Sequence, residues 1–326
     1  MEKIRAGIYG YGNIARSVEN AISKSADISL EAVFTRRDPN KVITASGVKA
    51  TAADRAPEFK DKIDIMFMCG GSAADLPKQG PETVRYFNIV DSFDTHAKIP
   101  EYLDMIDERA KKSKKVAVIS AGWDPGLFSM MKSLFSSLLP DGRGQAFWGP
   151  GVSQGHSDAI RQVEGVAGAV QYTVPDEKVL SEMRNGSEKD YTTRQKHRRI
   201  CYVVAKDGAD KGKITKVIKE MPYYFSDYDT EVNFVSPEEL KREHSRMPHG
   251  GNVIRNGRTS GGGAYHVEFS MKFDSNPDFT ASIMTAFARA ALKLYEEKEY
   301  GARTVLDIPL SYLSQKDRKG QIAEHL

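Results

Sequence analysis

Short hydrophobic runs alternate with polar, helix-like stretches along the first 125 residues. The run Ile4–Tyr9 predicts a buried strand, and Asn13–Ser23 after it predicts a helix. Four further runs predict strands at residues 30–34, 63–69, 87–90 and 116–119, and each ends in small or polar residues. Such alternation is typical of a Rossmann-type, doubly wound parallel α/β sheet, which binds its ligands at the carboxyl ends of the strands.

The pattern changes near residues 123–125. Runs at residues 145–148, 200–205, 230–235 and 265–273 alternate clearly between apolar and polar positions, which indicates a mixed or antiparallel sheet with one covered face. The glycine-rich segment 255–263 predicts a flexible hairpin loop. We therefore expect an α/β domain over residues 1–122 and an α+β domain over residues 123–276.

Apolar positions that recur every three to four residues follow a turn at residues 276–278 and predict an amphipathic helix. They are Phe279, Ile283, Phe287, Ala290 and Leu294. We expect this stripe to be core, packed either against the first domain or across a subunit contact. The segment 277–326 is expected to complete the first domain.

Small residues follow the first strand in the spacing G-x-G-x-x-A. Gly10 permits a tight turn, Gly12 lets a pyrophosphate approach the backbone, and Ala15 lets the helix pack closely on the strand. The helix N-terminus then presents its N–H groups to the phosphates. Because the motif stands between a strand and a helix, it favours a dinucleotide site over a glycine turn without a ligand.

The end of the second predicted strand indicates which dinucleotide binds. NAD-specific folds place a carboxylate here for the ribose hydroxyls, whereas this chain has Arg36 and Arg37. Guanidinium groups suit a 2′-phosphate, so the sequence favours NADP(H) over NAD(H). Two alternatives stay open: the arginines are solvated surface residues, or Asp38 points back to the ribose.

Asp94 and Asp124 each follow the carboxyl end of a predicted strand. Both are expected at the crevice that holds the nicotinamide. Paired acids beside a hydride acceptor suit a cationic amine, because they attract its charge and its proton must leave before hydride transfer. For either residue alone, the alternative is a helix N-cap or a turn.

Composition restricts the function classes further. The 326 residues are 28% charged and 40% hydrophobic with a net charge of +3, and no long basic run indicates nucleic acid. No apolar run approaches the roughly 20 residues of a membrane span, and we expect no signal peptide before the first strand. Two isolated cysteines, Cys69 and Cys201, fit a reducing cytoplasm. The seven histidines form no metal-binding motif, so no metal site is expected.

Later motifs are individually weak, since Trp148 suits a core, Arg199 an ion pair and His249 a loop. Together with earlier ones they follow one order through nearly the whole chain. The motifs are GYGN, TRR, CGGSA, DLP, VDSFDTH, GWDPG, FWGPGVSQGHSDA, VQYT, MPHGG and NPDFTAS. In this respect the chain resembles the meso-diaminopimelate dehydrogenases, which are NADP-dependent enzymes of bacterial lysine biosynthesis.

The resemblance implies a reaction and a site. The reaction is the reversible oxidative deamination of the D-centre of meso-2,6-diaminopimelate, which yields L-2-amino-6-oxopimelate (in equilibrium with tetrahydrodipicolinate), ammonia and NADPH. The implied catalytic residues are Asp94 and Asp124. The implied substrate contacts are Asp94, Asp124, Trp148, Ser153, Gln154, Gly155, Thr173, Arg199, His249 and Asn276. The expected cofactor contacts are Gly10, Tyr11, Gly12, Asn13, Ile14, Thr35, Arg36, Arg37, Cys69, Gly70, Gly71, Ser72, Ser92, Phe93, Asp94, Ala121, Gly122, Trp123, Asp124 and Pro125.

The resemblance also implies a cytoplasmic homodimer whose second domain, residues 123–276, binds substrate and dimerises. Two other functions stay open. One is an NADP-dependent reductase or dehydrogenase of the same architecture that acts on another D-amino acid or small polar acid. The other is a non-catalytic NADPH-binding regulator, against which Asp94 and Asp124 argue, since a sensor has no need for acids at the hydride position.

Overall fold

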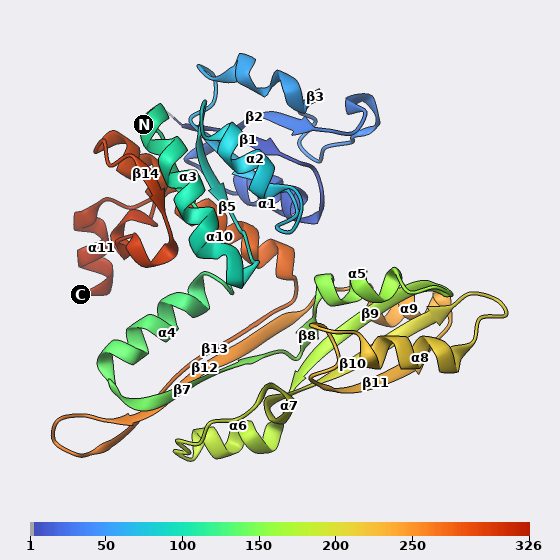
Figure 1. The fold of residues 1–326 in the computed structure, drawn as a ribbon. Coiled ribbons are helices and arrows are strands. Elements are labelled where there is room, and N and C mark those ends of the chain that lie inside the picture. The colour runs from blue at the N-terminus through green and yellow to red at the C-terminus, as the bar shows by residue number, and fades with distance from the viewer. Residues whose placement is uncertain (1–2) are drawn as a thin grey trace. The chain divides into compact units, whose positions relative to one another are not determined.

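The computed structural model describes residues 3–326, which form two compact units (Figure 1). The first unit runs to Met130 and includes the C-terminal segment Pro277–Leu326, and the second is Met131–Asn276. The sequence-based boundary after residue 122 differs from this division by the segment 123–130. That segment stays with the first unit, where Phe128 packs edge-on against Trp123 with ring centroids 5.4 Å apart.

A seven-stranded sheet forms the centre of the first unit, in the order β14-β6-β5-β4-β1-β2-β3. Every pair of neighbouring strands is parallel, so the predicted doubly wound sheet is confirmed. The strands are β1 (Ile4–Tyr9), β2 (Ile28–Thr35), β3 (Ala50–Ala52), β4 (Ile65–Met68), β5 (Asn88–Asp91), β6 (Val116–Val118) and β14 (Gly301–Arg303).

Helices cover both faces of this sheet. On one face, α1 (Asn13–Ser23) and α10 (Asn276–Glu296) share a core with Ala6 and Ile8 of β1. On the other face, α2 (Leu76–Thr83) and α3 (Ile99–Ser113) pack against β4, β5 and β6. The short helix α11 (Arg318–His325) lies near the C-terminus.

The predicted C-terminal helix begins three residues before Phe279, at Asn276. Its residues Phe287, Ala290 and Leu294 belong to the core beside β1, so the stripe packs against the first unit. Arg289 of the same helix forms an ion pair of 2.7 Å with Asp27, and this contact holds the pKa of Asp27 below its usual value. The C-terminal segment Pro277–Leu326 thus completes the fold that the first strand begins.

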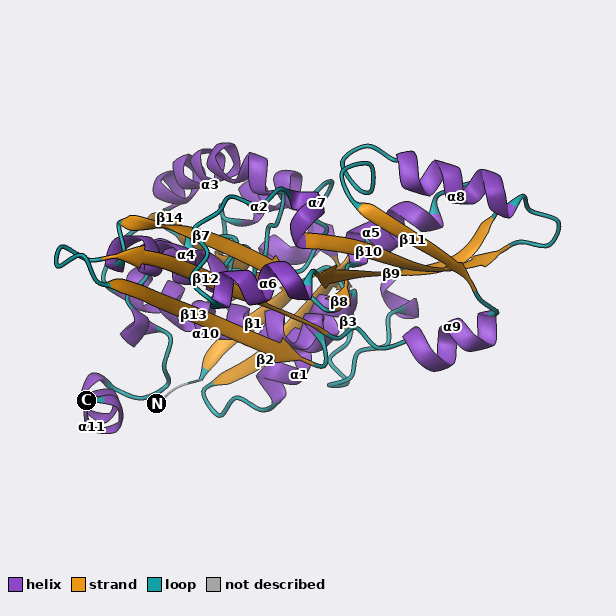
Figure 2. Cartoon of the chain, turned by 90° about the horizontal axis from the view of Figure 1, so that it is seen from below, coloured by secondary structure: helices purple, strands orange, loops and turns teal. Residues whose placement is uncertain are grey.

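The second unit contains two sheets, drawn in orange in Figure 2. A mixed sheet has the order β11-β10-β9-β8, and its strands are β8 (Gly151–Val152), β9 (Val166–Pro175), β10 (His197–Ala205) and β11 (Asp229–Phe234). An antiparallel sheet has the order β13-β12-β7, and its strands are β7 (Asp141–Trp148), β12 (His249–Arg258) and β13 (Ala264–Phe273).

The prediction of a loop over residues 255–263 is wrong for its first part, because residues 255–258 belong to β12. Arg255 pairs with Val267 of β13 and with Gly144 of β7, so two neighbouring strands hold it in place. The glycines of this strand allow close approach: a Cβ on Gly250 would lie 2.4 Å from the carbonyl oxygen of Met271. The hairpin connection is confined to residues 259–263.

Six helices accompany these sheets. They are α4 (Leu127–Leu138), which begins in the first unit, α5 (Gln154–Arg161), α6 (Glu177–Arg184), α7 (Thr193–Lys196), α8 (Lys211–Glu220) and α9 (Pro237–His244). α5 and α8 share a core with β9 and β10, and α6 packs against Phe147 and Ile254 of the antiparallel sheet. On α9, His244 stacks on Tyr202 of β10 with ring centroids 3.9 Å apart.

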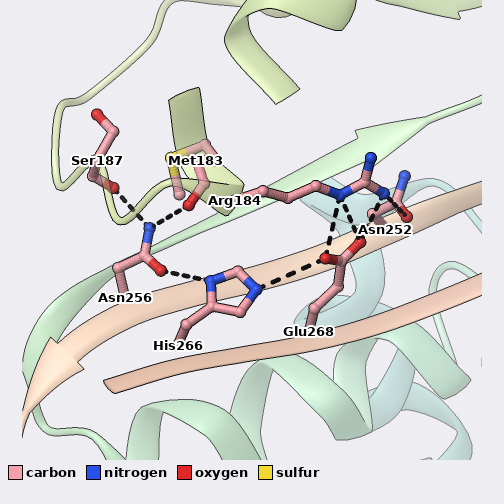
Figure 3. Close-up of polar contacts among 7 residues, drawn as sticks. All are labelled: Met183, Arg184, Ser187, Asn252, Asn256, His266 and Glu268. Carbon is pink, nitrogen blue, oxygen red and sulfur yellow. Dashed lines mark hydrogen bonds and ion pairs between the residues drawn. The ribbon is translucent and has the colours of Figure 1, made fainter. Parts of the chain in front are cut away.

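Polar contacts fasten α6 to β12 and β13 (Figure 3). The side-chain amide of Asn256 donates to the carbonyl oxygens of Met183 and Ser187, each at 2.7 Å. The Oδ1 of Asn256 lies 2.7 Å from a ring nitrogen of His266, and Arg184 pairs with Glu268 at 2.8 Å. Strand residues therefore hold both the end of the helix and the loop after it.

No helix within residues 3–326 is long and apolar enough to cross a membrane. In the same part of the chain, histidine, cysteine and acidic side chains do not gather into a group of three that could hold a metal ion. Cys69 and Cys201 are both free thiols, and burial raises the pKa of Cys201 to about 12.

Candidate functional site

The turn between β1 and α1 has the geometry that a pyrophosphate needs. Gly10 has φ +88°, a value that favours glycine, and its N–H donates to the carbonyl oxygen of Phe34 at 2.8 Å. Gly12 precedes α1, and a Cβ built on it meets no atom within 4 Å. No side chain of the N-cap residue bonds this end of the helix, so the N–H groups of its first residues, Asn13 and Ile14, are left for another acceptor, such as a phosphate.

Two arginines follow β2, as the sequence predicts. Arg36 forms an ion pair of 2.5 Å with Asp75 and stays 63% exposed. Arg37 donates from its side chain to the carbonyl oxygen of Tyr11 in the β1–α1 turn, and from its backbone to the Oγ of Thr35. Both guanidinium groups thus border the edge where an adenosine ribose binds in this class of fold.

Asp38 was the alternative partner for the ribose. Its carboxylate accepts the backbone N–H of Asn40 at 3.0 Å and so caps the short helical turn that follows. In NAD-specific folds the carboxylate after the second strand points to the ribose of the cofactor. The carboxylate of Asp38 instead bonds its own turn. The geometry therefore favours the arginines as the charged groups at this edge.

Arg36 also lines a groove of about 400 Å³. The other lining residues are Tyr9, Ala74, Asp75, Lys78, Gln79, Glu82 and Thr83. Arg36 and Lys78 supply two positive charges to it. Asp75 and Glu82 supply two negative charges to the same groove, and the carboxylate of Asp75, which pairs with Arg36, also accepts the N–H of Gly71 at 3.1 Å.

The loops after β4, β5 and β6 are joined at the same edge of the sheet. Cys69 begins the first loop, and its N–H donates to the carbonyl oxygen of Tyr9 at 2.9 Å. The N–H of Asp94 in the second loop donates to the Oγ of Ser72 in the first, at 3.1 Å. The predicted cofactor residues after these strands, Cys69, Gly70, Gly71, Ser72, Ser92, Phe93, Asp94, Ala121, Gly122, Trp123, Asp124 and Pro125, all lie on these loops.

Asp94 and Asp124 follow neighbouring strands, β5 and β6, so the structure brings the two predicted acids to adjacent loops. A third acid, Asp91, was missed by sequence reasoning. Its carboxylate accepts the N–H groups of Phe93 and Ser120 and the hydroxyl of Tyr102, at 2.8 to 3.0 Å. Burial raises the pKa of Asp91 to about 6. It holds both acid-bearing loops, and an aspartate directly after the apolar run 87–90 was the available signal.

The centre of the second unit's predicted site is Arg199 of β10. Arg199 is 5% exposed, and its guanidinium lies 3.8 Å from the ring centroid of Tyr228 and donates to Thr173. Burial lowers its pKa, its Nε has no hydrogen-bond partner, and within residues 3–326 it forms no ion pair with a carboxylate. A buried cation of this kind calls for an anionic ligand, because an unpaired charge is costly inside a protein.

Strand register places Thr173 between Arg199 and Gly151. Thr173 of β9 stands opposite Arg199 of β10 on one side and opposite Gly151 of β8 on the other. His249, 5% exposed, begins β12 and lies against Gly151 so closely that a Cβ there would be 2.4 Å from its ring. Two of these predicted substrate residues, Arg199 and Thr173, are therefore direct neighbours, and His249 lies at the strand on the other side of Thr173.

The N-terminus of α5 carries Ser153, Gln154 and Gly155. Gln154 Nε2 lies 3.0 Å from the sulfur of Met247, and the N–H of Asn276 donates to the carbonyl oxygen of Met247 at 2.9 Å. A Cβ on Gly155 meets no atom within 4 Å, so the first turn of α5 has open space beside it. Gln154 and Asn276 thus both contact Met247.

Four further polar residues of the second unit were not predicted as site residues; Gln171 and His197 are buried, and His156 and Thr230 are half-buried. Gln171 and Thr230 have side-chain atoms without hydrogen-bond partners and lie on strands that flank Arg199. His156 lies 2.6 Å from Ser153, and His197 lies beside Trp148; burial lowers the pKa of each histidine to about 3. A polar residue inside the apolar run 166–175 was the signal for Gln171, whereas Thr230 and His197 stand beside charged residues and gave no such signal.

The fold and these two sets of residues define a two-domain dehydrogenase with a Rossmann-type nucleotide domain. A family model, the diaminopimelic acid dehydrogenase C-terminal domain, matches residues 122–275. The meso-diaminopimelate D-dehydrogenase of Ureibacillus thermosphaericus is 54% identical over 316 residues, 97% of each chain. That of Corynebacterium glutamicum is 43% identical over 325 residues, 99% of each chain. The chain belongs to the meso-diaminopimelate D-dehydrogenase family.

Solved structures agree with this assignment. The C. glutamicum DAP dehydrogenase in complex with DAP has a TM-score of 0.94 and 41% identity, and the match covers 100% of both chains. A mutant meso-DAP dehydrogenase from Clostridium tetani with DAP has a TM-score of 0.94 and 49% identity, and the match covers 99% of this chain and 100% of that one.

Proposed function

We propose that this protein oxidises the D-centre of meso-2,6-diaminopimelate with NADP⁺ and catalyses the reverse reaction with NADPH, in lysine biosynthesis. The observation that carries the proposal is the buried guanidinium of Arg199, which has no carboxylate partner within residues 3–326. The substrate carries two carboxylates and two ammonium groups. An anion at Arg199 and a cation at Asp94 and Asp124 match its two ends.

Relatives support the substrate. The similar C. glutamicum structure contains DAP, and so does that of the C. tetani mutant. The C. tetani protein is substituted at a glutamine, a threonine, an arginine, a proline, a histidine and an asparagine. The same residue types stand at the same numbers in this chain, as Gln154, Thr173, Arg199, Pro248, His249 and Asn276. Five of these six are predicted substrate contacts.

NADP(H) as the cofactor is supported by Arg36 and Arg37 and by a further structure. An engineered D-amino acid dehydrogenase bound to NADP⁺ has a TM-score of 0.89 and 40% identity, and the match covers 99% of this chain and 100% of that one. When bound, NADP⁺ accepts a hydride at its nicotinamide ring.

The residues divide into three roles. Asp94 and Asp124 attract the reacting ammonium group, which must lose a proton before the hydride leaves its carbon. Trp148, Gln154, Gly155 and Ser153 surround the carboxylate of that centre. Thr173, Arg199, His249 and Asn276 hold the distal L-centre, and this anchoring aligns the D-centre hydrogen for transfer. Loss of hydride and proton leaves a substrate imine, which water converts to the 6-oxo acid and ammonia.

The proposal includes a homodimeric state in the cytoplasm, with substrate binding and dimerisation both assigned to the second unit. Leu134 and Leu138 of α4 support an interface, because they are apolar and 47% and 56% exposed. The free thiols of Cys69 and Cys201 support a reducing compartment. Sedimentation equilibrium of the wild type and of a Leu134→Glu, Leu138→Glu variant tests the dimer, which we expect only the wild type to form.

One assay separates the proposed function from its alternatives. NADPH formation is measured with meso-diaminopimelate, its LL isomer, D-alanine and D-lysine. We expect rapid turnover with the meso compound alone. Faster turnover of a simple D-amino acid indicates the broader dehydrogenase, and NADPH binding without turnover of any substrate indicates a regulator.

A further inference from the structure

Trp148 and His197 connect the two sheets of the second unit. Trp148 is the last residue of β7 in the antiparallel sheet, and His197 is the first residue of β10 in the mixed sheet. The N–H of Trp148 donates to Nε2 of His197 at 2.9 Å, and the two rings lie 5.1 Å apart at 31°. One histidine thus contacts both the backbone and the indole of a predicted substrate residue.

The backbone contact satisfies a donor that the sheet itself leaves unpaired. β7 is an edge strand, paired with β12 alone within its sheet. The next N–H, that of Gly149, donates to the carbonyl oxygen of Gly250 on β12. Because successive N–H groups of a strand point in opposite directions, the N–H of Trp148 points away from β12, and His197 supplies its acceptor.

The surroundings keep His197 an acceptor. Its side chain is 1% exposed, and burial together with the charges of Lys196 and Arg199 lowers its pKa to about 3. Nε2 therefore carries a lone pair near neutral pH, and the ring proton lies on Nδ1. Nδ1 has no hydrogen-bond partner in the part of the chain described, so the hydrogen bond of this imidazole is the one from Trp148, while its ring also lies 5.9 Å from that of Phe147.

Two lysines lie at the indole ring of Trp148. The Nζ atoms of Lys132 and Lys196 lie 5.9 and 5.8 Å from its centroid, and Lys196 also donates to Gln145 of β7 at 3.0 Å. Cation–π attraction at these distances favours one placement of the indole. The indole is thus held by side chains and its backbone by His197.

We propose that His197 is a positioning residue for the reaction: its neutral imidazole fixes Trp148 by accepting the Trp148 N–H, and so sets where the indole meets the substrate. The proposal rests on the proposed function, in which Trp148 contacts the reacting end of the substrate. His197 itself forms no bond to the substrate and acts through Trp148. A displacement of about 1 Å in a site residue can reduce turnover by up to a hundredfold.

Three substitutions isolate the acceptor atom. In His197→Gln, the side-chain oxygen reaches the place of Nε2; in His197→Asn, it reaches only the place of Nδ1; His197→Leu has no acceptor. We expect His197→Leu and His197→Asn to raise KM for meso-diaminopimelate about tenfold and to lower kcat, because the Trp148 N–H loses its partner. His197→Gln is expected to stay within threefold of wild type, and KM for NADP⁺ within twofold in all three.

The matched control is His244→Leu. His244 lies on α9 of the same unit, and its imidazole stacks on the ring of Tyr202 of β10. This variant is expected to lower the melting temperature without changing KM for either substrate. If His197→Leu behaves like this control, or if His197→Asn performs as well as His197→Gln, the positioning role is refuted and His197 is structural.

A spectroscopic readout separates this proposal from the proposed function. The chain has two tryptophans, so 5-fluorotryptophan labelling gives two ¹⁹F resonances, which Trp148→Phe assigns. We expect the Trp148 resonance to shift in His197→Leu and to return in His197→Gln, whichever amino acid the wild type oxidises. A wild type that fails to oxidise meso-diaminopimelate overturns the proposed function, whereas an unmoved Trp148 resonance overturns the role of His197.

Discussion

The nucleotide edge of the first unit and the substrate residues of the second differ in how their charged side chains are satisfied. At the nucleotide edge the charges have protein partners: Asp91 accepts three hydrogen bonds, and Arg36 pairs with Asp75. Buried polar atoms without hydrogen-bond partners occur in both units, at Gln79 and Ser120 in the first and at Gln171 and Thr230 in the second, but the second unit also buries Arg199 without a carboxylate partner among the described residues. An unpaired buried charge destabilises a fold, so its presence in the second unit indicates that an anionic ligand completes it.

The largest effect that tests this difference is expected from Arg199→Met. We expect kcat/KM for meso-diaminopimelate to fall about a thousandfold, since a buried charge partner of a ligand contributes several kcal/mol. The free energy of unfolding is expected to stay level or rise by about 1 kcal/mol, because an unpaired buried charge is removed.

Steady-state kinetics measure kcat/KM, and urea unfolding measures the free energy of unfolding. Arg198→Met is the matched control, because Arg198 is the exposed neighbour on the same strand. This variant is expected to change neither kcat/KM nor the free energy of unfolding. A large loss of stability in Arg199→Met would show that its guanidinium holds the fold together, and the contrast between the units would disappear.

Asp124→Asn tests the first unit. We expect kcat to fall about a hundredfold, because the acid acts on the ammonium group in the transition state, while NADPH affinity stays within twofold. Fluorescence titration with NADPH and stopped-flow turnover measure the two effects. Loss of NADPH binding would assign Asp124 to the nucleotide fold instead of to the chemistry.

The double substitution Arg36→Ala, Arg37→Ala tests the cofactor. We expect KM for NADP⁺ to rise about thirtyfold and KM for NAD⁺ to change less than threefold, since only NADP⁺ has a 2′-phosphate for charge-assisted bonds. Arg55→Ala is the control, because Arg55 forms an exposed ion pair with Glu58 away from the site. Equal changes for both cofactors contradict the assignment.

Turnover in the deamination direction should increase with pH above neutral. The reacting amine must be neutral before hydride transfer, so each pH unit is expected to raise the rate by up to about tenfold until another step limits it. The measurement is kcat/KM for meso-diaminopimelate from pH 7 to 10. A flat profile contradicts the need for a neutral amine.

Between pH 6.5 and 5, buried groups of the two units should change stability with opposite sign. His156 and His197 have pKa values lowered to about 3, so between pH 6.5 and 3 the unfolded state takes up protons that the folded state refuses. Each histidine then removes about 1.4 kcal/mol of stability per pH unit. The pKa of Asp91, raised to about 6, acts in the other direction, because the folded state holds its proton more tightly as pH falls below 6.

Amide hydrogen exchange at pH 7 and pH 5, corrected for intrinsic rates, measures this difference. Protection in β9 and β10 is expected to fall more than protection in β5 and β6. The His156→Gln, His197→Gln variant should reduce the fall in the second unit. Equal losses in both units are the contrary result.

Much of the first unit was predictable because its signals are local. Ile4–Tyr9 and Asn13–Ser23 have the predicted bounds as β1 and α1, and Asp94 and Asp124 follow parallel strands whose carboxyl ends meet at one edge. The edge strands β3 and β14 were not predicted, because each has three residues and so few residues show no periodic pattern of apolar positions.

Prediction was poorer in the second unit, where glycines have another use. β12 contains Gly250, Gly251 and Gly257, and a glycine-rich stretch is typical of a loop. Here the glycines permit close approach of neighbouring strands: a Cβ on Gly257 would lie 2.6 Å from the carbonyl oxygen of Asp141. Such neighbours are more than a hundred residues away in sequence, so no local pattern reports them.

The sequence by itself determined the parallel sheet, the nucleotide turn, the basic end of β2 and the two acids, since each depends on residues within one strand and the turn after it. The tertiary structure decided which residues meet: Thr173 with Arg199, Gln154 and Asn276 at Met247, and His197 under Trp148. The physical reason is strand register, which depends on pairing between distant segments and places every side chain on one face or the other.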